Sequence, residues 1–425
     1  MRNRFSLQNV ETALSIRSLL ALVSFSSNMF IAKTIVKASG AGQFAIYGLI
    51  TSLPGLLPFA DFGLGRSLYN NLVNKFANKK IDRGDRILFT DTFFILSIIS
   101  CSAILSIFIV DQFFSLGRIF ALNYYGDFDL YVMMVFSLMW ISVPFSIGFN
   151  VLEAAGKINL SIGIQIMIPV FSIVGIWTCY ITKTYQYNTA LLFPSLGYFL
   201  SCLISFKLAS KYVKGLKTSV GSLIKTLHAT WQSSIWSLAV ITFLALTLQI
   251  PRYILINNHR LAEAAKYTYA AFFLIPMISL IQISSSWLAV RVKMERNRSV
   301  QNLIIKRQTI KTFIYVSFAL STLYLLTIIK PNFFGVHLAL QDWLVMYFSL
   351  LFANLFGIPL RSLTSVNFLR FFSILGFTVL TSLTLLCYLI NTGSNFAIFL
   401  EFLLPMNCIL AFATTQYLRK NSIPL

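Results

Sequence analysis

Three polar residues in one apolar segment have the types and spacing to bind an anion. Arg17, Ser24 and Asn28 lie within residues 14–36, where most other side chains are apolar. At roughly 100° per residue of a helix, Ser24 and Asn28 fall within about 20° of the direction of Arg17. We therefore predict a polar stripe that lines a hydrated cavity, with Arg17 as the residue that binds the anion. The alternative is that Arg17 extends to the lipid headgroups.

Further ionisable residues are candidates for function because charge is costly inside an apolar segment. Arg252 follows Pro251 and lies near Gln249, and Lys266 lies in the next apolar segment. We expect both basic residues to contact substrate, although anchoring at the membrane interface would explain them equally well. Glu401 lies in the last apolar segment. It is a candidate for coupling to a proton or sodium ion, and pairing with a basic residue is the alternative.

The sequence argues against metal and nucleotide chemistry. Its three histidines and five cysteines are scattered, without an HExxH or CxxC pattern. It contains no GxxxxGK[ST] phosphate-binding loop, so we expect neither ATP hydrolysis nor a cofactor. Asp61, Asp91 and Glu153 fall at the ends of apolar segments, where we expect each to pair with a nearby Lys or Arg.

The elements that position these residues follow from the composition. Of 425 residues, 57% are hydrophobic and 11% are charged. Soluble domains carry about 25% charged residues, so a water-soluble enzyme and a disordered chain are excluded. A membrane-spanning helix needs about 20 mostly apolar residues. Twelve segments meet this requirement: 14–36, 41–63, 89–110, 130–152, 158–181, 189–209, 229–250, 264–289, 308–329, 340–360, 369–390 and 395–417.

The basic residues predict the orientation of an all-α polytopic membrane protein. Lys and Arg number 34 against 13 Asp and Glu, which gives a formal net charge of +21. With both termini in the cytoplasm, about three quarters of the basic residues fall on cytoplasmic segments, as the positive-inside rule requires. This charge therefore orients the protein in the membrane, and it does not indicate binding to nucleic acid.

Twelve spans divide into two lobes of the same orientation. We predict an N-terminal six-helix lobe over residues 1–210, a cytoplasmic linker over 211–228 and a C-terminal six-helix lobe over 229–425, around a central cavity. A weak internal match supports this division. Residues 42–54 align with residues 264–276, which pairs Tyr47 with Tyr269 and Pro54 with Pro276.

Three short motifs resemble those of a known family. The second segment ends in ADFGLGR (residues 60–66) and the fourth ends in LEAAGK (residues 152–157). The first segment enters with Ser18-Leu19, and the second segment starts with a Gly-x-x-x-Tyr-type stretch from Gly42 to Tyr47. In these features the chain resembles Wzx-type polysaccharide flippases of the multidrug/oligosaccharidyl-lipid/polysaccharide exporter superfamily. It departs from the usual pattern in the eighth segment, where Leu-Ala-Val and not proline follows Trp287.

The resemblance implies a transporter and not an enzyme. Its cargo would be an undecaprenyl-pyrophosphate-linked oligosaccharide, moved by alternating access from the inner to the outer leaflet of a bacterial cytoplasmic membrane. The transported unit would serve O-antigen, lipopolysaccharide, capsule or exopolysaccharide assembly, with a polysaccharide polymerase as a partner. An ion gradient would supply the energy.

Three other functions remain open at this point. A multidrug exporter of the same fold would need carboxylates that bind cationic drugs, and the apolar segments hold few. An O-antigen polymerase would need a large outer loop, whereas the longest outer loop here is residues 111–128. A structural scaffold would not explain the polar stripe that begins at Arg17.

Overall fold

The computed structural model describes residues 7–52, 63–77, 81–114, 128–181, 191–213, 219–258, 260–274, 298–329, 340–362, 366–390 and 406–416. All regular structure in these residues is helical. The chain divides into two compact units, Met1–Ile31 with Ile46–Ala245 and Ala32–Ala45 with Leu246–Leu425. Helices α1 (Leu7–Ser39), α2 (Ala41–Ser52) and α12 (Val220–Asn257) contribute residues to both units. The lobe boundaries expected from the sequence stay a prediction.

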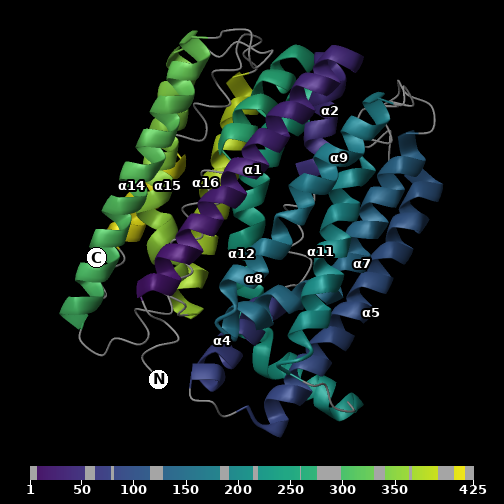
Figure 1. Ribbon diagram of the computed structural model, residues 1–425, viewed down its shortest axis with the longest axis vertical. Coiled ribbons are helices and arrows are strands. Elements are labelled where there is room, and N and C mark those ends of the chain that lie inside the picture. The colour runs from purple at the N-terminus through teal and green to yellow at the C-terminus, as the bar shows by residue number, and fades with distance from the viewer. Residues whose placement is uncertain are drawn as a thin grey trace. The chain divides into compact units, whose positions relative to one another are not determined.

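The first unit is a bundle built around helix α7. Besides parts of the shared helices, it contains α4 (Leu64–Ala77), α5 (Arg83–Phe114), α7 (Phe128–Ala154), α8 (Ile158–Gln165), α9 (Met167–Ile181) and α11 (Leu192–Ala209). Helix α7 packs against α4, α5 and α11, and α11 also packs against α9 (Figure 1). This arrangement buries one face of α7 along its length.

Phenylalanine rings fill the contact between α5, α7 and α11. The ring of Phe206 lies 4.9 Å from that of Phe93 and 5.5 Å from that of Phe145, measured between centroids. The ring of Phe89 stacks on the Phe206 ring at 5.6 Å. Aromatic pairs in such geometries add about 0.5–1.5 kcal/mol each beyond the area they bury. The three helices are therefore held by specific ring contacts as well as by general burial.

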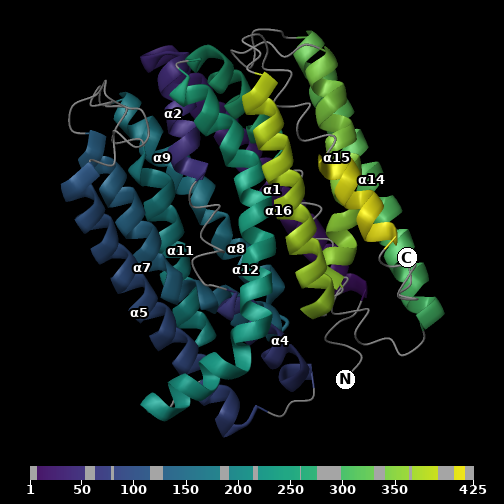
Figure 2. The same ribbon diagram turned by 180° about the vertical axis from the view of Figure 1, so that it is seen from behind.

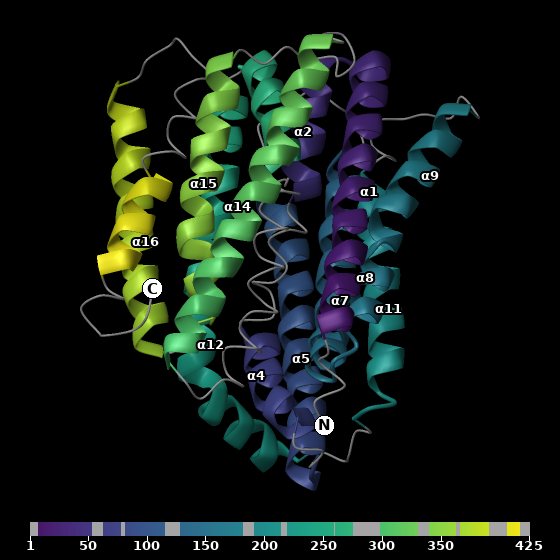
Figure 3. The ribbon, with the colours of Figure 1, turned by 60° about the vertical axis from the view of Figure 1, so that its left-hand side comes forward.

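The second unit joins its helices through side-chain amides. It contains helical residues 261–274 and 406–416, together with α14 (Arg298–Ile329), α15 (Leu340–Ser362) and α16 (Val366–Ile390). Helices α14 and α15 pack side by side (Figures 2 and 3). Asn354 Nδ2 donates to the Thr309 carbonyl at 3.1 Å, and Asn407 Nδ2 donates to the Ser349 carbonyl at 3.2 Å. Such hydrogen bonds from neutral amides join helices without any charged side chain.

The helices follow the apolar segments of the sequence. A described helix overlaps each of the twelve predicted segments. Five described stretches are long and apolar enough to cross a membrane: Arg83–Phe113, Leu130–Ala154, Ile158–Thr178, Leu192–Ala209 and Leu303–Ile329. The fold is thus that of a polytopic helical membrane protein, while the count of twelve spans and the cytoplasmic termini stay predictions.

Two local features differ from the simple pattern of apolar spans. Helix α4 lies in a stretch that the sequence assigns to a connection, and it buries Leu64, Leu68 and Leu72 along one face. The segment 158–181 is not one helix, because α8 ends at Gln165 and α9 begins at Met167. Pro169 lies just after this break, and it has no N–H to donate to the Gln165 carbonyl four residues earlier.

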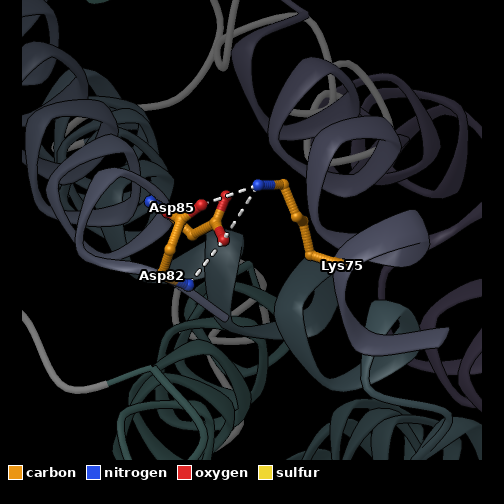
Figure 4. A network of polar contacts seen from close by, with 3 residues as sticks. All are labelled: Lys75, Asp82 and Asp85. Atoms are coloured by element: carbon orange, nitrogen blue, oxygen red, sulfur yellow. Dashed lines mark hydrogen bonds and ion pairs between the residues drawn. The ribbon is translucent and has the colours of Figure 1, made fainter. Parts of the chain in front are cut away.

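Two aspartates cap the start of α5. The Asp82 N–H donates to Asp85 Oδ2 at 3.0 Å, and the Asp85 N–H donates to Asp82 Oδ1 at 2.9 Å. Lys75 Nζ at the end of α4 lies 2.7 Å from Asp82 Oδ2 and 3.8 Å from Asp85 Oδ2 (Figure 4). This reciprocal arrangement is a capping box, which satisfies free N–H groups of the first helical turn. The ion pair also links α4 to α5.

We expect the Lys75–Asp82 ion pair to make stability depend on pH in the acid range. The hydrogen bond from Lys75 lowers the pKa of Asp82 from 3.8 to about 2. A lowered pKa contributes stability that is present above the unfolded value and is lost as the pH falls through the folded value. The thermal midpoint of the wild type should therefore approach that of Asp82→Asn between pH 4 and pH 2.

The asparagine of this variant would keep the helix cap but not the charge, so the comparison isolates the ion pair. The effect should be small because Asp82 is exposed. A constant difference between the two midpoints across this pH range would contradict the assignment.

Candidate functional site

A fully buried arginine marks the candidate site in the second unit. Arg252 lies on α12 directly after Pro251, and its exposed fraction is 0%. Its Nη1 donates to Gln249 Oε1 at 3.4 Å. The guanidinium carbon lies 5.9 Å from the centroid of the Tyr267 ring, within the range of a cation–π contact. A guanidinium is seldom fully buried, so its position calls for a functional explanation.

The helix opposite Arg252 is buried on nearly all sides. Tyr267, Thr268 and Tyr269 follow one another in helical residues 261–274, and each is at most 1% exposed. Consecutive helical residues point about 100° apart, so these three directions cover most of the helix circumference. From Tyr267 to Leu274 this helix is therefore surrounded by protein.

Aromatic rings continue from Tyr269 through the second unit. The Tyr269 ring lies 6.4 Å from the Phe44 ring and 5.3 Å from the Phe273 ring. Phe273 in turn lies 5.1 Å from Trp343. These edge-to-face contacts hold the helix that carries Tyr267 in a defined rotation. The position of the Tyr267 ring next to Arg252 is thus set by packing.

Two further polar atoms of the second unit are buried. Gln43 Oε1 and Thr268 Oγ1 have no hydrogen-bond partner among the residues that the structure describes. Buried polar atoms nearly always have partners in native proteins, from protein, water or ligand. The unit therefore offers a cation, an amide oxygen and a hydroxyl, which suit an anionic and hydroxyl-rich ligand, and it also contains a buried carboxylate oxygen, Glu263 Oε2.

A buried carboxylate lies in the first unit. Asp91 of α5 is fully buried and accepts hydrogen bonds from Ser222 Oγ at 3.0 Å and Thr226 Oγ1 at 2.9 Å, both on α12. Asp91 therefore bonds to two hydroxyls and not to the Lys or Arg that we expected from the sequence. Glu153 likewise accepts from Ser161 Oγ at 3.4 Å. Hydroxyls from α12 satisfy the Asp91 carboxylate.

The residues predicted in α1 lie in the first unit. Ser24 and Asn28 are half-buried, and the side chain of Arg17 lies outside the described residues. Ser27, between them in sequence, is buried and donates to the Pro169 carbonyl at 3.1 Å. This bond fixes α1 against α9. The role of the stripe in binding substrate stays a prediction.

The other predicted residues have different surroundings from Arg252. Lys266 is exposed, although it directly precedes the buried Tyr267. Glu263 forms an ion pair with Arg260 at 2.7 Å. Glu401 lies outside the described residues. The substrate roles of Arg252 and Lys266 and the coupling role of Glu401 stay predictions.

Sequence reasoning missed the residues that surround the buried charges. Tyr267, Ser222 and Thr226 lack any local pattern that would single them out, and Ser222 is 131 residues from Asp91. The sequence alignment of Tyr47 with Tyr269 singled out Tyr269, which is buried in the second unit. No group of three or more His, Cys, Asp or Glu side chains that could hold a metal ion occurs in the described part of the chain.

Solved structures share this fold. An outward-facing multidrug resistance MATE family transporter of the MOP superfamily matches with a TM-score of 0.68 at 12% identity, over 96% of this chain and 94% of that chain. A Vibrio cholerae MATE transporter matches with a TM-score of 0.64 at 12% identity, over 97% and 98%.

A third similar structure differs in its reported pocket. It is a MOP superfamily transporter from Pyrococcus furiosus, described as having a binding pocket of reverse polarity that suggests a different function. It matches with a TM-score of 0.63 at 14% identity, over 96% of this chain and 95% of that chain. No protein family and no characterised protein matches the chain by sequence. The chain therefore has the fold of MATE transporters of the MOP superfamily.

Proposed function

We propose that this chain is a multi-pass transporter of the bacterial cytoplasmic membrane that moves an undecaprenyl-pyrophosphate-linked oligosaccharide from the inner to the outer leaflet. The product would enter O-antigen, capsule or exopolysaccharide assembly. The likeness to transporters supports a transport function. We base the choice of an anionic cargo on the fully buried Arg252 beside Tyr267.

Arginine suits the task of taking a pyrophosphate out of water. Its planar guanidinium can donate two parallel hydrogen bonds to phosphate oxygens, and it keeps its charge when buried. A buried guanidinium that binds the cargo offsets part of the desolvation of the pyrophosphate. The buried oxygens of Gln43 and Thr268 in the same unit would bind sugar hydroxyls.

The distribution of acidic residues supports the same choice. No Asp or Glu occurs between Glu153 and Glu263. The buried acidic residues of the described chain are Asp85, Asp91 and Asp342, and the half-buried Glu263 pairs with Arg260 through Oε1 while its Oε2 is buried. Asp85 belongs to a helix cap, and Asp91 accepts two hydroxyl hydrogen bonds. A cavity for organic cations would need carboxylates that face the cargo. The Pyrococcus furiosus transporter is a precedent for reversed pocket polarity on this fold.

The second candidate is a multidrug exporter, which the similar structures favour because one of them is a multidrug resistance transporter. The two functions require cargo of opposite charge. They also predict different roles for Arg252, since an arginine would repel a cationic drug and attract a pyrophosphate.

Reconstitution distinguishes the two candidates. Purified protein in vesicles should move a fluorescent pyrophosphate-linked glycolipid between leaflets, measured as the fraction that dithionite added outside reduces. The same vesicles should not accumulate a cationic dye under an imposed proton or sodium gradient. Transport of the dye without movement of the glycolipid would overturn the proposal in favour of a drug exporter.

Arg17 provides a test in the cell. Arg17→Ala should abolish surface polysaccharide while the protein stays in the membrane, because the stripe would lose its anion-binding charge. Arg17→Lys should be less damaging than Arg17→Glu. The glycan profile on a gel and the membrane level on an immunoblot measure both effects. A normal glycan profile in Arg17→Ala would show that Arg17 does not bind the cargo. Equal effects of Arg17→Lys and Arg17→Glu would indicate that Arg17 acts through packing.

The proposal includes an ion gradient as the source of energy. The sequence has no phosphate-binding loop, so a proton or sodium gradient would drive transport, with Glu401 as the coupling residue. Glu401→Gln should then stop gradient-driven accumulation while exchange without a gradient continues. A polysaccharide polymerase that uses the translocated unit is the expected partner.

A further inference from the structure

The first turns of α12 expose a continuous apolar stripe. Val220 is 73% exposed, Ile224 is 64% exposed and Trp231 is 55% exposed. With Leu227 and Ile235 they recur every three or four residues. At 3.6 residues per turn, these five side chains fall within an arc of about 80°. Exposed apolar residues in such a contiguous arrangement indicate a binding surface.

Beside the stripe, the same turns carry a polar face that is buried. Thr226, Thr230 and Ser234 recur every four residues and are at most 9% exposed. Thr226 donates to Asp91 of α5, and so does Ser222. These bonds fix the rotation of α12 and keep the apolar stripe turned outward. The exposure of the stripe is thus a consequence of the buried Asp91.

The stripe begins outside the span that the sequence predicts. Residues 220–228 precede the predicted span 229–250, so an upright helix would carry Val220, Ile224 and Leu227 out of the hydrocarbon. The first turns of α12 instead run at an angle to the turns that follow (Figures 2 and 3). An oblique helix with one apolar face is the geometry of a segment that lies in the membrane interface. Tryptophan is enriched at that depth, and Trp231 lies near the start of the predicted span 229–250.

The part of the chain that contains the stripe carries charge of one sign. Five lysines occur at positions 207, 211, 214, 217 and 225, in a stretch from Glu153 to Glu263 that contains no acidic residue. Lys207, Lys211 and Lys225 are exposed. Lysines beside an apolar helix face complement the anionic headgroups of a membrane leaflet. They would not select a zwitterionic surface.

We propose that residues 219–235 form an interfacial anchor that binds anionic phospholipid at the membrane surface, with the apolar stripe immersed and the lysines on the headgroups. Asp91 holds this anchor on the first unit. The anchor rests on the proposal that the chain spans a membrane and is independent of the cargo, so a failure to transport glycolipid would leave it standing.

Spin labels on full-length protein in lipid nanodiscs test the anchor. After the five cysteines are replaced by serine, a label is placed through Leu227→Cys on the stripe or through Lys225→Cys on its flank. The two directions differ by about 160°. The Leu227→Cys label should be relaxed more by oxygen than by a water-soluble nickel chelate, and the Lys225→Cys label should show the reverse. Replacing phosphatidylcholine with phosphatidylglycerol should increase this difference, and high salt should reduce it.

Three results would overturn the proposal. Equal access of the chelate to both labels would place the segment in water. Protection of the Leu227→Cys label from both reagents would indicate a protein partner or a second copy. If phosphatidylglycerol did not change the difference between the two labels, the segment would not bind anionic lipid selectively. Fluorescence quenching of Trp231 by brominated lipids tests the same immersion with the natural cysteines in place. The contribution of Trp231 is the difference in quenching between the wild type and Trp231→Phe.

Discussion

Replacing Arg252 by alanine is expected to abolish translocation of a pyrophosphate-linked glycolipid while the protein remains folded in the membrane. Its guanidinium is fully buried beside Tyr267 and Gln249, so it is desolvated before the cargo arrives. Removing one member of a buried charge pair costs about 2 kcal/mol or more. The rate of leaflet exchange in proteoliposomes should therefore fall by about 30-fold or more.

Two variants control for loss of charge and loss of structure. Arg252→Lys should be intermediate, because lysine keeps the charge but not the planar pair of donors. Arg260→Ala is the matched control, since Arg260 pairs with Glu263 at a partly exposed position eight residues later. It should leave the rate nearly unchanged. Wild-type rates in Arg252→Ala, or an equal loss in Arg260→Ala, would contradict a specific role for Arg252.

Gly148→Ala should strongly destabilise the first unit. A Cβ at this position would lie 2.6 Å from the Phe206 Cα and even closer to the Phe206 backbone N, so α7 and α11 would have to move apart. Overpacking of this kind typically costs about 1–3 kcal/mol. Alanine gains at most about 1 kcal/mol over glycine in a helix, which does not offset the clash. We expect a lower thermal midpoint in detergent and weaker ring contacts around Phe206.

Gly163→Ala is the matched control for this substitution. Gly163 lies in α8, and a Cβ there would meet no atom within 4 Å. The same change of residue should therefore be neutral or slightly stabilising. If both variants shifted the midpoint in the same direction by the same amount, the close approach of α7 to Phe206 would not be the determining contact.

Hydropathy alone predicted the long helices of this fold but not the amphipathic one. Helices α5, α7 and α11 coincide with predicted apolar segments. Helix α4 was assigned to a connection because polar residues separate its buried leucines. These polar residues lower the mean hydropathy over any window as long as a membrane span. The division of segment 158–181 into α8 and α9 is consistent with Pro169, but proline alone does not say whether a helix bends or stops.

For the site, sequence reasoning identified a buried charge and not its surroundings. Arg252 was singled out because it follows Pro251 beside an apolar segment, and Gln249 was within reach by helical spacing. The ring of Tyr267 and the hydroxyls that reach Asp91 come from other helices. Contacts between helices distant in sequence depend on packing, which no local spacing encodes.

The sequence by itself determined the class of this protein, because 57% hydrophobic and 11% charged residues suit a membrane and not water. It also located the charges that a membrane makes costly. Only the tertiary structure decided which apolar faces meet protein: Phe273 is fully buried, whereas Phe318 is 74% exposed. The physical reason is that lipid tails and apolar side chains are nearly equivalent surroundings for a phenylalanine. Composition therefore cannot separate the two surroundings, and packing geometry does.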